Sequence, residues 1–159
     1  MKKNVFTILA LLVTIVTFSQ TKIGANLVYG SESDLGIGAK ASFGLSEEFK
    51  ISPSINYFFS ESVPNVSITT MSFNADAHYF FEIQDKFSLY PLAGINVFYT
   101  SVSSSYITSY SASSNSFGLN LGGGMNYLLS EKLTAFSEIK LMLNTGNQVV
   151  FCAGVMYNL

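Results

Sequence analysis

Apolar residues alternate with other residues along most of the chain from Lys22 onward. Such alternation places two sets of side chains on the two faces of a β-strand, whereas an amphipathic helix needs apolar residues three and four positions apart. No helical repeat of that kind is sustained after Lys22. The alternating segments predict eight strands, at about residues 22–30, 34–45, 49–60, 67–83, 87–100, 116–129, 133–144 and 148–159.

The two faces of the predicted strands differ in polarity. Odd-numbered positions carry no charge in any of the segments, and most of them are aliphatic or aromatic. Even-numbered positions are mixed, with many glycine, serine and asparagine residues. They also include six charged residues and a histidine that are candidates for a network inside the barrel: Lys40, Lys50, Asp76, His78, Glu82, Glu138 and Lys140. One face is therefore uniformly apolar, and the other is polar and crowded.

The connections between segments are of two kinds. Three short polar links, 46–48, 84–86 and 130–132, predict tight hairpins that keep the odd positions on one face. The other connections, 31–33, 61–66, 101–115 and 145–147, are longer or less uniform. Short turns at one end and longer loops at the other are typical of outer-membrane barrels.

Two closed antiparallel barrels fit this pattern. A secreted ligand-binding barrel would turn the apolar face inward, whereas an outer-membrane barrel turns it toward lipid. Nine glycines on the even face, at positions 24, 36, 38, 44, 94, 118, 122, 124 and 154, suit a crowded lumen better than a hydrated surface. Aromatic residues of the odd face also gather near both strand ends, as in the two interfacial belts of membrane barrels. The sequence thus predicts an all-β, eight-stranded antiparallel up-and-down transmembrane β-barrel.

The first twenty residues have the composition of a cleaved signal peptide. A basic start precedes a twelve-residue apolar run at 5–16, and small residues precede a cut after Ser19 or Gln20. The run is shorter than the roughly 20 residues of a spanning helix, which disfavours a membrane anchor. We therefore predict a signal peptide at 1–20 and a barrel domain at 21–159. The net charge of −2, with scattered lysines, indicates no nucleic-acid partner.

The last six residues, GVMYNL, resemble the terminal-strand signal of bacterial outer-membrane proteins. In that signal the barrel-assembly machinery recognises a glycine, an aromatic residue two positions before the end and a hydrophobic last residue. Gly154, Tyr157 and Leu159 match, with leucine in place of the commoner phenylalanine. The signal-peptide ending FSQ is common in Bacteroidota, and residues 21–159 resemble the small outer-membrane β-barrel domain proteins, similar to the barrel of outer-membrane protein A and to outer-membrane protein X. The resemblance implies an integral outer-membrane location, contact with lipid and lipopolysaccharide, and no cofactor.

Two prolines disturb the predicted barrel. Pro53 and Pro91 lie at odd positions inside predicted strands, and proline has no backbone N–H to donate. We expect a bulge or a break in the hydrogen-bond ladder at each of them.

The inward-facing charges are expected to form a network that holds the barrel closed. Three acids (Asp76, Glu82, Glu138) face three lysines (Lys40, Lys50, Lys140), with His78 nearby, and enclosed charges must be paired. Loss of Glu138 is accordingly expected to leave Lys140 without a partner. Eight strands leave an interior just wide enough for side chains, and inward aromatic residues such as Phe58, Phe98 and Phe136 are expected to plug it.

The function predicted from these features is a structural or surface-interaction role through the extracellular loops. Loop 101–115 is uncharged and rich in hydroxyls and tyrosines, a composition able to bind sugars or proteins. The alternative, which we favour, is a flexible, hydrated surface loop or two strand extensions above the membrane, and deletion of residues 102–114 is then expected to leave folding intact. A narrow gated channel is the first alternative, and a lipid-modifying enzyme is the second.

An enzyme on this barrel would need a serine, histidine and acid where lipid can reach them. The single histidine, His78, shares the inward face with Asp76, Ser72 and Ser88, so we predict no enzymatic activity. Cys152 is predicted to be a small packing residue, and no cluster has the spacing of a metal site.

Overall fold

The computed structural model describes residues 21–59, 66–104 and 110–159. The predicted signal peptide at 1–20 lies outside the described residues, as do parts of loops 61–66 and 101–115. The strands are β1 (Thr21–Gly30), β2 (Asp34–Gly44), β3 (Phe49–Phe58), β4 (Val66–Tyr79), β5 (Phe81–Gln84), β6 (Phe87–Ser104), β7 (Tyr110–Ser130), β8 (Leu133–Leu143) and β9 (Gln148–Asn158). Within the described part of the chain, no helix is long and apolar enough to cross a membrane.

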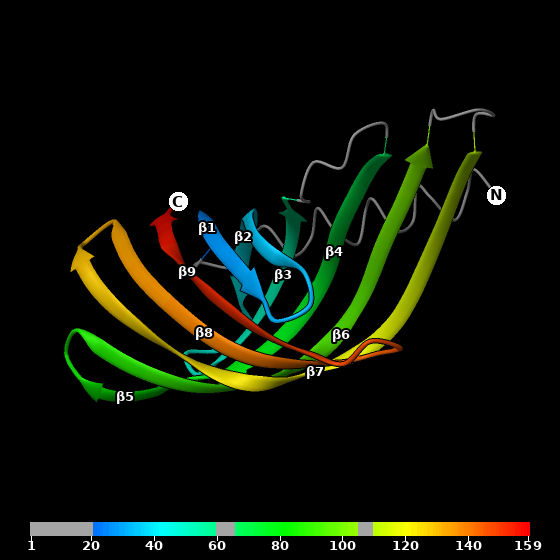
Figure 1. Ribbon diagram of the computed structural model, residues 1–159. Coiled ribbons are helices and arrows are strands. Elements are labelled where there is room, and N and C mark those ends of the chain that lie inside the picture. Colours follow the sequence, from blue (N-terminus) through cyan, green and yellow to red (C-terminus); the bar gives the residue numbers. More distant parts are fainter. Residues whose placement is uncertain (1–20, 60–65, 105–109) are drawn as a thin grey trace, which may run out of the picture.

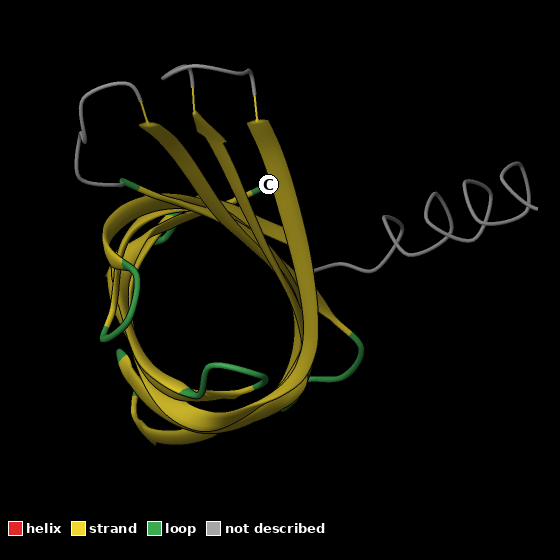
Figure 2. Ribbon diagram, turned by 45° about the vertical axis from the view of Figure 1, so that its right-hand side comes forward, coloured by secondary structure: helices red, strands yellow, loops and turns green. Residues whose placement is uncertain are grey.

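The strands close into an antiparallel barrel. Apart from β4 and β5, which do not pair with each other, each strand pairs with its neighbours in the chain; β1 also pairs with β9, and β4 pairs with β6. The short strand β5 continues the line of β4 along the same side of β6, so the nine strands occupy eight positions around the ring. Figure 2 shows this ring from near its axis. The predicted eight-stranded up-and-down barrel is therefore confirmed.

The predicted division into an apolar and a polar face holds around the whole barrel. Paired residues in the ladders share the same parity, apart from shifts beside two of the short turns, so odd positions lie beside odd positions. Large apolar side chains are exposed on every strand: Leu27, Ile37, Ile55, Phe73, Phe81, Ile95, Leu121, Ile139 and Phe151. Even positions such as Asn56 and Asn120 are buried inside. An apolar band this continuous is suited to lipid and not to water.

Both prolines interrupt a ladder, as expected. The β2–β3 ladder skips the positions of Pro53 and Ser52, and the ladder between β4–β5 and β6 skips Pro91 and Tyr90. The register is the same on both sides of each gap, so these are ladder breaks and not bulges. At both positions a backbone N–H would point toward the strand on the interrupted side, which is β2 for Pro53 and the β4–β5 line for Pro91, and proline has no N–H to donate.

The break opposite Pro91 corrects one predicted strand. Segment 67–83 is divided into β4 and β5, which are separated at Phe80. The other side of this segment stays bonded, since the Phe80 N–H donates to the carbonyl oxygen of Glu48 at 2.8 Å.

A second finding concerns the end of the barrel with the longer loops. Of the forms expected for residues 101–115, the described residues form the strand extensions, because β6 continues to Ser104 and β7 begins at Tyr110. Together with the start of β4, these strands rise above the rest of the rim (Figure 1). Apolar alternation at odd positions ends there, which is why the sequence pattern ended early. Serine, threonine and valine residues nevertheless continue the ladder.

Candidate functional site

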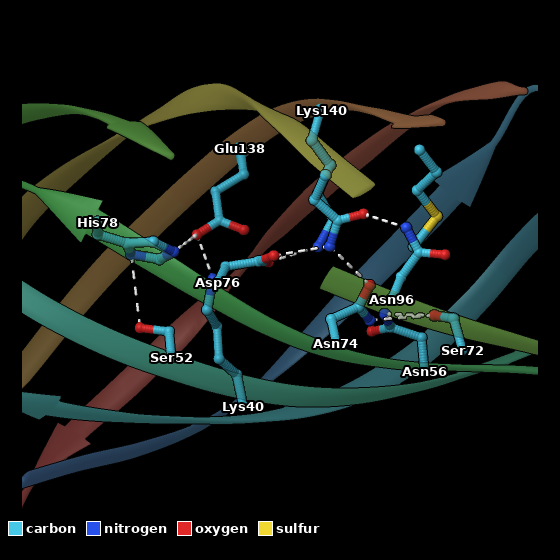
Figure 3. A network of polar contacts seen from close by, with 12 residues as sticks. Lys40, Ser52, Asn56, Ser72, Asn74, Asp76, His78, Asn96, Glu138 and Lys140 are labelled. Carbon is cyan, nitrogen blue, oxygen red and sulfur yellow. Dashed lines mark hydrogen bonds and ion pairs between the residues drawn. The ribbon is translucent and has the colours of Figure 1, made fainter. Parts of the chain in front are cut away.

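Two ion pairs cross the lumen of the barrel. Lys40 on β2 pairs with Glu138 on β8. Lys140, also on β8, donates from Nζ to Asp76 Oδ2 on β4 at 2.8 Å (Figure 3). All four side chains are at most 5% exposed. Burial removes water from these charges, so each depends on its partner.

The pairing differs from the expected one. Glu138 and Lys140 are successive inward positions of one strand, and each reaches toward a different strand across the lumen. Glu138 also accepts a hydrogen bond of 2.8 Å from the Tyr90 hydroxyl. Loss of Glu138 would therefore leave Lys40, and not Lys140, without its counter-ion.

Two predicted members of the network lie apart from it. Glu82 is exposed on β5, beyond Phe80, in an opening of about 140 Å³ at the end with the short turns. Lys50 lines the same opening, with its Nζ 4.7 Å from the centroid of the Phe80 ring. Neither has an ion-pair partner among the described residues. Their even positions predicted correctly that both side chains face inward. They did not predict how far each lies from the centre of the lumen, from which Phe80 separates them.

A chain of amide side chains continues the network toward the other end. Asn120 donates to Asp76 Oδ1 at 2.6 Å and to Asn74 Oδ1 at 3.1 Å, and Asn96 donates to Asn120 at 2.7 Å. Further bonds join Asn74 to Ser72, Ser72 to Asn56, and Asn56 to Asn26. The alternation of the sequence predicted that these asparagines lie inside the barrel, but it did not connect them. Their recurrence at similar depth on even positions of several strands is the sequence feature that could have predicted the chain.

Glycines allow several of these bonds to form across an intervening strand. Gly94 on β6 pairs with both Asp76 and Asn120, which hydrogen-bond over it. A Cβ at Gly94 would lie 2.7 Å from the Asp76 Cα, so no larger residue fits. The same arrangement recurs in two other rows, in which Asn26 and Asn56 bond over Gly38 and Tyr90 and Glu138 bond over Gly124.

His78 lies among these groups without completing a catalytic set. Its ring stacks on Tyr90 with centroids 4.7 Å apart, and Nδ1 is 3.4 Å from Ser52 Oγ. Nε2 has no hydrogen-bond partner among the described residues and lies 3.9 Å from Glu138 Oε1. The serine near His78 is thus Ser52, which the sequence did not single out, and not Ser72 or Ser88. These groups are buried, and the cavity beside them is about 10 Å³, about the space of one water molecule.

Apolar side chains close the lumen on both sides of the network. On the side with the longer loops, Val28, Phe58, Met142 and Val150 form one buried cluster, with Phe98 packed against it. On the other side Phe80, Tyr90 and Leu92 form a second cluster. Cys152 packs in the first cluster, and no group of described residues is placed to hold a metal ion.

The residues of the expected assembly signal lie on and after β9. Gly154 faces inward between Asn26 and Phe136, and Tyr157 faces outward beneath the Lys132 ammonium, which lies 6.0 Å from its ring centroid. Leu159 is 73% exposed. Tyr157 belongs to the outward aromatic residues near the short turns.

Comparison with known proteins identifies related chains. Residues 11–157 match the family described as outer membrane protein beta-barrel domain. The N-terminal β-barrel domain of Pseudomonas aeruginosa OprF is 14% identical, with 89% of this chain and 98% of that chain covered and a TM-score of 0.72. A major outer membrane protein of Thermus thermophilus is 10% identical, with coverages of 88% and 98% and a TM-score of 0.67. Ail, the attachment invasion locus protein of Yersinia pestis, is 17% identical, with coverages of 88% and 97% and a TM-score of 0.62. At these identities the structural likeness concerns the fold. No curated protein matches the chain in sequence.

The ion pairs predict which substitutions are coupled. Glu138→Gln removes the counter-ion of Lys40 and should lower the free energy of unfolding by about 3–5 kcal/mol, because a buried charge is left unpaired. Adding Lys40→Met should recover part of this loss, whereas adding Lys140→Met should not, since it strands Asp76 as well. Urea unfolding of each variant, refolded in lipid vesicles, measures its free energy of unfolding. A larger recovery with Lys140→Met would contradict the pairing.

The glycine rows predict a position-specific cost. Gly94→Ala should lower the free energy of unfolding by about 1–3 kcal/mol, because its Cβ overlaps Asp76 and displaces the bond to Asn120. Gly146→Ala is the matched control, since nothing lies within 4 Å of the added atom. The same urea titration applies, and equal effects of the two substitutions would refute the explanation.

Proposed function

Because the chain belongs to the outer membrane protein beta-barrel domain family, we propose that this outer-membrane barrel acts at the cell surface through the sheet that β4, β6 and β7 raise above its rim. The observation that carries the proposal is the length of these strands. β4 and β6 remain paired up to Val66↔Ser104, and β6 and β7 up to Ser104↔Tyr110. The neighbouring strands β3 and β8 have already ended at Phe58 and Leu143.

The chemistry of this sheet supports a surface role. Its outward positions carry hydroxyl and amide groups, including Thr69, Ser101, Ser113 and Asn115, in place of the apolar residues below. Ser113 and Asn115 are exposed. Such groups are suited to hydrogen bonding in water and not to contact with acyl chains. Ail shares this fold and is named for attachment, so a barrel of this kind is compatible with the role.

The closed lumen supports a role outside it. Val28, Phe58, Met142 and Val150 are at most 1% exposed and lie between the polar network and the end with the longer loops. The proposal includes no catalytic step, because Ser52, His78 and Glu138 are enclosed, away from lipid. Lipid and lipopolysaccharide are the proposed surroundings of the apolar band. The barrel-assembly machinery is the proposed reader of Gly154, Tyr157 and Leu159.

Because the lumen is closed, we expect the barrel to conduct no ions. The refolded protein in planar bilayers should give no discrete conductance steps, and neither should Glu138→Ala, because the apolar cluster is untouched by that substitution. A narrow channel is the alternative, since Lys22, Lys50 and Asn126 line both the opening at the short-turn end and the small cavity beside His78. Steps whose size changes with Glu138→Ala would establish that alternative in place of a closed barrel.

We expect that removal of the raised sheet abolishes surface attachment but leaves the barrel folded. Deletion of residues 102–114 leaves Thr100 and Ser101 as a two-residue turn between the paired Tyr99 and Asn115. Residues 105–109 of this segment lie outside the described part. Bacteria displaying the shortened chain should attach less to a protein-coated surface than bacteria displaying the full chain, at equal heat-resistant barrel content in the outer membrane. Equal attachment would contradict the proposed function.

A further inference from the structure

The opening at the short-turn end of the lumen is surrounded by six charged side chains. Its volume is about 140 Å³, which is room for roughly ten water molecules. The charged residues that line it are Lys22, Glu47, Lys50, Glu82, Asp85 and Lys86. Three positive and three negative charges therefore share one small space.

Among the described residues, none of these six charges is paired with another. The ion pairs all belong to the polar network at the centre of the lumen. Lys50 instead lies over the Phe80 ring, and Lys22 donates from Nζ to Thr134 Oγ1 at 3.1 Å. Opposite charges thus line the opening without closing the space between them.

Lys22 and Lys50 form the inner end of the opening. Lys22 on β1 and Lys50 on β3 are half-buried, whereas Lys86 and the three acids are exposed. Both inner lysines also line the small cavity beside His78. A half-buried ammonium group without a counter-ion is costly, and two such groups that line one space repel each other. The inner end is therefore suited to an anionic group.

Neutral hydrogen-bonding groups lie beside the two inner lysines. Asn126 on β7 lines both the opening and the small cavity, and its Oδ1 atom is buried without a hydrogen-bond partner in the described part of the chain. Rotation about the last side-chain bond exchanges the oxygen and the NH₂ group of an asparagine, so Asn126 can present a donor there. Ser88 is its partner in the β6–β7 ladder and lines the same opening.

The three acids lie at the mouth of the opening. Glu47 and Asp85 belong to short turns, and Glu82 belongs to β5. The ladders place Glu82 beside Ser88 and Ser88 beside Asn126, so these inward positions form one row. A simple anion that approaches the inner lysines passes the acids, which repel it. A molecule that also carries a positive charge at its outer end is attracted by them instead.

We propose that this opening binds a small zwitterion whose carboxylate and ammonium groups are joined by a short chain. The carboxylate lies between Lys22 and Lys50 beside the Asn126 amide, and the ammonium lies at the mouth near Glu82. Short turns face the periplasm in outer-membrane barrels, so the ligand is a solute of that compartment. The inference goes beyond the proposed surface role and is independent of it, because the opening and the raised sheet lie at opposite ends of the barrel.

The test uses 5-aminopentanoate, a zwitterion small enough for the opening. The full barrel in lipid nanodiscs is titrated with this compound, and its backbone amides are followed by NMR. Saturable shifts are expected at Lys22, Lys50, Glu82 and Asn126, with a dissociation constant on the order of 1 mM for so small a ligand. Amides of the raised sheet, such as that of Ser113, should not shift.

Two matched compounds separate the two charges of the ligand. Pentanoate lacks the ammonium group, and 5-aminopentanamide has a neutral amide in place of the carboxylate. Each should bind about fivefold more weakly than 5-aminopentanoate, because each loses one of the two ionic contacts. Equal binding of pentanoate would reduce the opening to a simple anion site, and equal binding of the amide would show that the lysines are not used. Either result overturns the inference.

Two variants locate these contacts on the protein. Lys50→Gln should weaken binding of 5-aminopentanoate about tenfold, and Glu82→Gln about fivefold. Glu82→Gln should not weaken binding of pentanoate, because it removes only a repulsive charge. Lys132→Gln is the matched control, since Lys132 lies over the outward Tyr157 ring at the same end of the barrel and should leave binding unchanged.

Unchanged spectra away from the opening establish that each variant is folded. Glu82 is exposed, so Glu82→Gln tests the site even where Lys50→Gln refolds poorly. Shifts that rise linearly with concentration and never saturate would overturn the inference. So would a Glu82→Gln variant that binds 5-aminopentanoate as tightly as the unchanged protein.

Discussion

The narrowness of an eight-stranded lumen is the constraint on which this structure depends. A polar group that faces inward has almost no water with which to form hydrogen bonds, so its partner must be another inward side chain. Partners on adjacent strands are not always of the right type, and the bonds then span three strands. Glycine at the middle position makes this possible, as Gly38, Gly94 and Gly124 do. The glycine content of the even face is therefore a requirement of the polar network.

The same constraint connects segments that are distant in sequence. Lys40 and Glu138 are 98 positions apart, and Asp76 and Lys140 are 64 positions apart, yet each pair is buried at the centre of the barrel. A sheet that failed to close would leave these charges unpaired in an apolar environment, at a cost of several kcal/mol for each ion. The network thus favours the closed barrel over partly closed arrangements with the same strand pairs. Its charges act on the specificity of the fold as much as on its stability.

The sequence determined the faces of the barrel but not the contacts inside it. Parity alone placed Asn56, Asp76 and Lys140 inward, because the side-chain period of a strand is two residues and the hairpins preserve it. Partner choice depends on the stagger of strands around the ring, which an apolar pattern does not encode, so Glu138 was assigned to the wrong lysine. Depth was also hidden, since nothing in parity distinguishes Glu82 at the opening from Glu138 at the centre. The sequence left open whether residues 101–115 form a hydrated loop or two strand extensions, because the apolar positions change face above the membrane.

That change of face also fixes how deep the barrel sits. On β4, β6 and β7 the hydroxyl row Thr69, Ser101 and Ser113 lies two rows above the apolar row Phe73, Val97 and Phe117, with Met71, Tyr99 and Asn115 between them. Sinking by one row, about 5 Å along the membrane normal for tilted strands, would bring polar groups into the acyl chains. Rising by the same amount would expose aromatic side chains to water. The barrel is therefore held at one height on this side. Strands β1, β2, β8 and β9 carry no such row, so the membrane surface is free to adjust around them by local thinning or by tilt of the whole barrel.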